Sequence, residues 1–140
     1  MPILRLVLAI IGGIVIGSVV NMALIMVSGH IIAPPAGVDM TTPEGMHSSM
    51  ALLGPRHFLF PFLAHAIGTL IGAFIAVKIT EQHKLLAALL VGALFFLGGV
   101  SMARVIPAPT WFIALDLIVA YFPFAWFGFI LANNSKEKAI

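Results

Sequence analysis

The sequence predicts an all-α, polytopic integral membrane protein: a four-helix bundle with both ends of the chain in the cytoplasm. Of its 140 residues, 61% are hydrophobic and only 9% are charged, whereas soluble domains carry about 25% charged residues. So few charged side chains cannot cover a surface that faces water, and lipid must therefore surround most of the chain. The second observation is that the apolar residues gather in four long runs.

The four runs lie at about 3–32, 58–78, 85–106 and 110–132. Each reaches the ~20 residues that a helix needs to cross a ~30 Å hydrocarbon core. Lipid cannot hydrogen-bond backbone groups, and the runs lack the alternation of barrel strands, so we expect helices. The first run is too long for a signal peptide, and we interpret it as a retained helix.

Basic residues near the ends of the runs predict the orientation. Arg56 and Arg104 fall on one side, and five basic residues fall on the other: Arg5, Lys78, Lys84, Lys136 and Lys138. The positive-inside rule then places both termini in the cytoplasm and the loop 33–57 outside. A net charge of +2 from scattered residues does not indicate nucleic-acid binding.

The outer loop 33–57 carries the signals of a short helix. Thr42 offers a hydroxyl N-cap, Pro43 suits the first helical position, and Glu44 places an acid in the first turn. Apolar side chains then recur at helical spacing: Met46, Met50 and Leu53. We expect a short amphipathic helix on the outer face with its methionines toward the membrane; the alternative is an irregular loop.

Prolines interrupt two of the predicted spans. Pro61 either opens the helix at 58–78 or kinks it one turn in. Pro123 is interior to the fourth span, removes a hydrogen bond to the carbonyl of Val119, and should bend the helix there.

Small residues recur every fourth position on three spans, a pattern that lets helices approach closely. The predicted packing residues are Gly13, Gly17, Ala64, Gly68, Gly72, Ala76, Gly92 and Gly99. We interpret them as packing positions within the chain. The alternative is a seam between copies in a homo-oligomer, or a docking face for a larger membrane-protein partner.

Every span sends at least one polar side chain to the outer half of the membrane, counting depth at ~1.5 Å per residue. The candidate cluster is Asn21, His65, Thr69, Arg104 and Asp116. A charge in hydrocarbon is costly, so Asp116 needs a partner. We expect Arg104 to pair with it across the tight turn, with His65 as the next candidate.

This polar cluster has two interpretations. It is either a structural knot that fixes the register of the bundle, or a ligand pocket or proton relay open to the outside. A second, weaker cluster in and near the loop combines imidazole and thioether groups, which suit Cu(I). Its members are His30, His47, His57, Met40, Met46 and Met50. Their spacing is irregular, so we predict neither a metal nor a cofactor.

The chain resembles a family of small four-helix bacterial inner-membrane proteins that have no assigned activity. The resemblance rests on the segments Phe58-Leu59-Phe60-Pro61-Phe62-Leu63-Ala64-His65-Ala66 and Pro107-Ala108-Pro109-Thr110-Trp111-Phe112. It implies the architecture and a location in the bacterial inner membrane, but no substrate and no functional residue.

Three functional hypotheses follow. The first is a non-enzymatic membrane protein, oligomeric or an accessory subunit, with its polar cluster as a structural knot. The second is a binding or transport module for a small molecule, ion or proton, with an outward-facing pocket. The third is a membrane enzyme acting on a lipid or quinone, with His65 and Asp116 as its acid–base pair.

Overall fold

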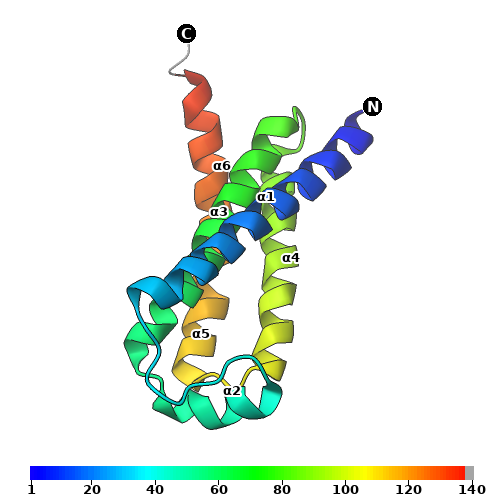
Figure 1. Cartoon of the computed structure of the whole chain (residues 1–140). Coiled ribbons are helices and arrows are strands. Elements are labelled where there is room, and N and C mark those ends of the chain that lie inside the picture. The colour runs from blue at the N-terminus through cyan, green and yellow to red at the C-terminus, as the bar shows by residue number, and fades with distance from the viewer. Residues whose placement is uncertain (138–140) are drawn as a thin grey trace.

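The computed structural model describes residues 1–137, and this part of the chain is helical without strands. Four segments are long and apolar enough to cross a membrane, which confirms the predicted class of a helical membrane bundle. They contain α1 (Pro2–Ile31), α3 (Leu59–Ile79), α4 (Lys84–Val105) and the pair α5 (Thr110–Val119) and α6 (Phe122–Glu137) (Figure 1). Lys138, which contributed to the predicted orientation, lies outside the described residues.

The two ends of the bundle differ in what they contain. The N-terminal end of α1 and the C-terminal end of α6 lie at the same end of the bundle as the short turn between α3 and α4 (Figure 1). The opposite end holds α2 (Pro43–Ser49), the one-turn helices η1 (Met50–Leu52) and η2 (Pro55–Phe58), and the turn before α5. We call this the α2 end. Whether it faces outside the cell stays a prediction.

Helices α1 and α3 are in direct backbone contact. A Cβ atom placed on Gly17 would lie 2.5 Å from the carbonyl oxygen of Gly68, so no larger residue fits there without a shift. Gly13 likewise faces the carbonyl oxygen of Gly72. Glycine at these positions lets the two helices cross closely, and Figure 1 shows α1 running obliquely over the bundle.

The fourth span is interrupted where Pro123 predicted a bend. α5 ends at Val119 and α6 begins at Phe122, so Pro123 lies in the first turn of α6, where its missing N–H is tolerated. The interruption leaves Tyr121 at the junction with only 1% of its surface exposed. Pro61 likewise lies in the first turn of its helix, as the third residue of α3.

A hydrogen-bonded loop holds the start of α2. The side chain of Thr42 accepts from the backbone N–H of Gly45 at 3.0 Å and so caps the helix. The carboxylate of Asp39 accepts from the N–H of Thr41 at 2.8 Å, from its hydroxyl at 2.6 Å, and from the hydroxyl of Thr42 at 3.2 Å. Asp39 also donates its own N–H to the hydroxyl of the buried Ser49 at 2.8 Å.

We expect α2 to loosen in acid because of Asp39. The hydrogen bonds from Thr41 lower the pKa of Asp39 below its ordinary value. A carboxyl group whose pKa is lower in the folded state stabilises that state above its unfolded pKa, and this contribution is lost as pH falls through the folded pKa. The chain contains no cysteine, so a spin label on His47→Cys would report the mobility of α2 at a single site.

The label should become more mobile only below the ordinary range of carboxyl titration. In an Asp39→Asn background it should be mobile already at pH 7, without that acid transition. A transition of equal size and midpoint in both proteins would show that Asp39 does not order α2.

Candidate functional site

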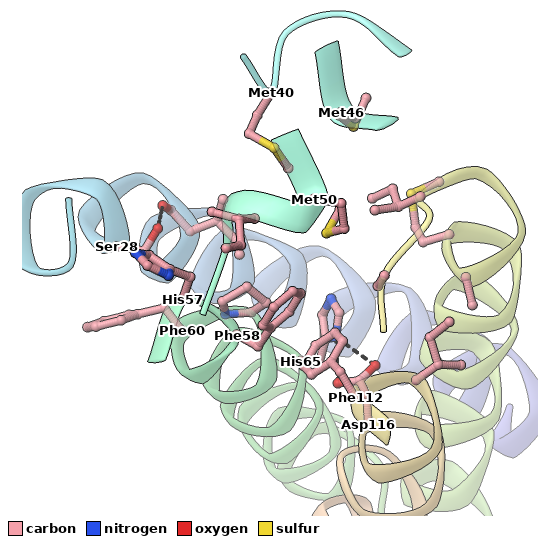
Figure 2. A pocket seen from close by; sticks show the side chains of 18 of the residues that line it. Ser28, Met40, Met46, Met50, His57, Phe58, Phe60, His65, Phe112 and Asp116 are labelled. Atoms are coloured by element: carbon pink, nitrogen blue, oxygen red, sulfur yellow. Dashed lines mark hydrogen bonds and ion pairs between the residues drawn. The ribbon is translucent and has the colours of Figure 1, made fainter. Parts of the chain in front are cut away.

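The buried carboxylate of Asp116 is held by α5 against an imidazole on α3. Nδ1 of His65 lies 2.8 Å from Oδ1 and 2.9 Å from Oδ2 of Asp116. Asp116 is only 5% exposed, while the side chain of His65 is 26% exposed. The histidine is therefore the more accessible member of the pair, and Asp116 contacts its ring at Nδ1 (Figure 2).

Tyr121 completes this polar group. Its hydroxyl donates to Oδ2 of Asp116 at 2.9 Å, and its ring stacks on the imidazole of His65 with the ring centres 5.8 Å apart. The Asp116 carboxylate is thus bonded from two sides, which is how buried polar groups are normally satisfied. The group of three residues joins α3, α5 and the junction before α6.

The polar pair borders a cavity of about 550 Å³. The cavity lies between the α2-end halves of α1 and α4 and the helices α3 and α5, and residues around α2 cover it. Its wall is mainly apolar, with aromatic and thioether side chains such as Phe58, Phe112, Met46, Met50 and Met102. Polar side chains are few: Asn21, Ser28, His57, His65 and Asp116.

Three polar atoms in the described part of the chain are buried without a hydrogen-bond partner. They are Oδ1 of Asn21, Nε2 of His57 and Oγ1 of Thr69. Asn21 and His57 line the cavity. Thr69 is fully buried on α3 and does not belong to the cavity wall. The candidate cluster predicted from the sequence is therefore only partly assembled around the cavity.

Arg104 does not join this cluster, and the expected ion pair with Asp116 is wrong. Arg104 is exposed near the end of α4, and in residues 1–137 the hydrogen-bond partners of the Asp116 side chain are His65 and Tyr121. The two residues flank the same turn, but Arg104 is exposed whereas Asp116 is buried. Tyr121 was visible in the sequence as a polar residue of the fourth span, two positions before Pro123, and no role was predicted for it.

The predicted packing residues lie at contacts within the chain. Ala64 and Ala76 are fully buried on α3, and Gly68 and Gly72 face the glycines of α1. Gly92 lies against Ala125 of α6 and Gly99 against the ring of Tyr121. Because these small residues already serve packing inside one chain, they give no support to a seam between copies, and a homo-oligomer stays a prediction.

The weak metal candidates are not brought together as a set. Met40, Met46, Met50 and His57 line the cavity, whereas His30 and His47 do not. Within residues 1–137, no three or more His, Cys, Asp or Glu side chains form a group that could hold a metal ion.

No family model, curated protein or solved structure matches this chain. The resemblance to small bacterial four-helix proteins therefore stays a prediction, and a function can be inferred only from the cavity and its polar groups.

The arrangement suits the binding of a molecule that is mostly apolar and has a small polar group. The apolar wall favours hydrocarbon or aromatic surface, while His65 offers one polar atom at a fixed place. Asp116 fixes the orientation of that imidazole through Nδ1, in the way that carboxylates orient histidines in other sites.

Proposed function

We propose that the protein is a multi-pass membrane protein that binds a small, largely apolar molecule in this cavity. The observation that carries the proposal is that His65, held by the buried Asp116, borders a cavity of about 550 Å³ with an otherwise mainly apolar wall. Ligand cavities in proteins typically measure about 300–1,000 Å³ and combine apolar walls with a few fixed polar groups.

The ligand reaches the cavity from the bilayer. Ile25 on α1 is 37% exposed and Met102 on α4 is 50% exposed, and both also line the cavity. In a chain surrounded by lipid, these apolar side chains form a rim that lipid touches. A lipophilic molecule can therefore move between bilayer and cavity without crossing water. The predicted orientation would place the cavity in the outer half of a bacterial inner membrane.

Filling the cavity should remove the bound molecule. Ala103 lines the cavity, whereas Ala114 is exposed on α5 and does not. We expect native mass spectra of protein extracted from membranes to show a small lipophilic adduct on the wild type and on Ala114→Phe. Ala103→Phe should carry at least about tenfold less of this adduct, because the added ring occupies the space of the bound molecule in the cavity. Equal amounts of adduct on Ala103→Phe and Ala114→Phe would mean that the molecule is bound outside the cavity.

A second candidate function is purely structural, and Tyr121 favours it. Its buried hydroxyl ties the junction before α6 to Asp116 of α5, which in turn pairs with His65 of α3, as a knot that fixes the helix register would. This alternative suits the accessory-subunit hypothesis and needs no ligand. It predicts that Ala103→Phe behaves like Ala114→Phe in every assay. Acid–base catalysis by His65 and Asp116 is a further hypothesis, which turnover by the purified protein, lost in His65→Phe, would test.

A further inference from the structure

Asn21 places an unsatisfied acceptor in the cavity wall. Its Oδ1 is buried and has no partner, which destabilises the protein when no ligand or water satisfies it. Close packing fixes its position: a Cβ atom on Gly68 would lie 3.1 Å from the Cβ of Asn21. The side chain therefore cannot move deeper between α1 and α3 to find a partner for this oxygen.

His65 presents a second polar atom to a ligand. Nδ1 of its imidazole lies 2.8 and 2.9 Å from the two side-chain oxygens of Asp116, so Nε2 is the ring nitrogen left for a ligand. The other ionisable neighbour of the pair is Tyr121, whose hydroxyl is already used on Asp116.

Asn21 and His65 come from the same part of the α1–α3 contact. Gly68, which contacts Asn21, lies three residues after His65 on α3, and residues three apart share one face of a helix. Asn21 and His65 both line the cavity. One hydroxyl group can bond to Oδ1 of Asn21 and to Nε2 of His65 when that nitrogen carries the ring hydrogen, because its hydrogen donates one hydrogen bond while its oxygen accepts another.

We infer that the cavity selects a lipophilic alcohol or phenol, whose hydroxyl group donates to Oδ1 of Asn21 and accepts from Nε2–H of His65. This inference rests on the proposed function and names the class of its ligand. The apolar wall takes the hydrocarbon or aromatic body of the molecule. Sites built to hydrogen-bond a hydroxyl discriminate strongly against analogues that lack it, because their own polar groups are then left unpaired.

A matched pair of probes tests the inference: 4-heptylphenol and its methyl ether 4-heptylanisole, which lacks the donor hydrogen. Both are added at equal mole fractions of the lipid to the full chain in nanodiscs. Binding is followed by the rise in melting temperature and by native mass spectrometry. We expect the phenol to bind about tenfold or more tightly than the ether, which corresponds to about 1.4 kcal/mol or more.

Asn21→Leu should reduce this preference to less than about twofold. Met22→Leu, at the exposed neighbouring position on α1, should keep it in full. Equal binding of the two probes to the wild type, or an unchanged preference in Asn21→Leu, would overturn the inference and leave the proposed function standing. If neither probe nor any native lipophile binds the wild type, the proposed function itself fails. The comparison on the wild type decides the inference even if Asn21→Leu does not fold.

Discussion

Replacing Asp116 by alanine should lower the free energy of unfolding by about 3–5 kcal/mol, the typical cost of removing one member of a buried, hydrogen-bonded pair. The change removes the hydrogen-bond partner of two groups at once, Nδ1 of His65 and the hydroxyl of Tyr121. Asp116 is 5% exposed, so water cannot readily replace it. The loss would be measured as a fall in the melting temperature in detergent.

Two milder variants serve as controls for Asp116→Ala. Asp116→Asn keeps the shape and one acceptor oxygen, so we expect a smaller loss. Tyr121→Phe removes a single hydrogen bond and should cost about 0.5–1.5 kcal/mol. An Asp116→Ala protein as stable as the wild type would show that the polar group does not hold α3 and α5 together.

Replacing Gly17 by valine should have the second-largest effect. The new side chain would lie against the carbonyl oxygen of Gly68 and the ring of Phe95, so α1 must move away from α3. Overpacking of this kind costs about 1–3 kcal/mol. Asn21 lies one turn further along α1, so its side chain would move with the helix, and we expect weaker binding of 4-heptylphenol as well as a lower melting temperature.

Gly98 offers the matched control for this change. A Cβ atom on Gly98 would meet no other atom within 4 Å, although the residue is also helical. Gly98→Val should therefore leave both stability and binding close to those of the wild type. Equal losses in Gly17→Val and Gly98→Val would point to a general cost of valine in these helices rather than to the α1–α3 contact.

The membrane-spanning helices were predictable because the apolar composition and the length of a run suffice to identify one. Hydrophobic runs located the long helices, and Pro123 marked the interruption between α5 and α6. The signals at Thr42 and Pro43 located the start of α2. The sequence did not show that the loop folds around Asp39, since its bonds to Thr41 and Ser49 depend on the path of the backbone.

The partners of Asp116 were harder to predict. Counting residues gives the depth of a side chain along a helix, and by that measure Arg104 and Asp116 lie close together. It does not give the rotation of one helix about its axis relative to another, which packing decides. Here α5 turns Asp116 toward His65 and Tyr121, while Arg104 stays exposed on α4.

The outline of the cavity could not be predicted from the sequence. Its outline depends on how α1 crosses α3, which the glycine contacts at Gly13 and Gly17 determine, and on the segment around α2 that covers it. Of the predicted cluster, Asn21, His65 and Asp116 line this space, whereas Thr69 and Arg104 do not. Three of the five side chains in the predicted polar cluster therefore form part of the wall of a cavity, and the cluster was open to both interpretations, a structural knot and a ligand pocket.

A magnetic-resonance titration on the histidines tests most directly whether a lipophile is bound against His65. The chain has five histidines, so selective ¹⁵N labelling in nanodiscs gives a spectrum simple enough to assign with His65→Phe. We predict that saturating 4-heptylphenol shifts the Nε2 resonance of His65 and leaves those of His30, His47 and His83 in place. An unchanged His65 resonance, under conditions where the probe is shown to bind the protein, would contradict the account.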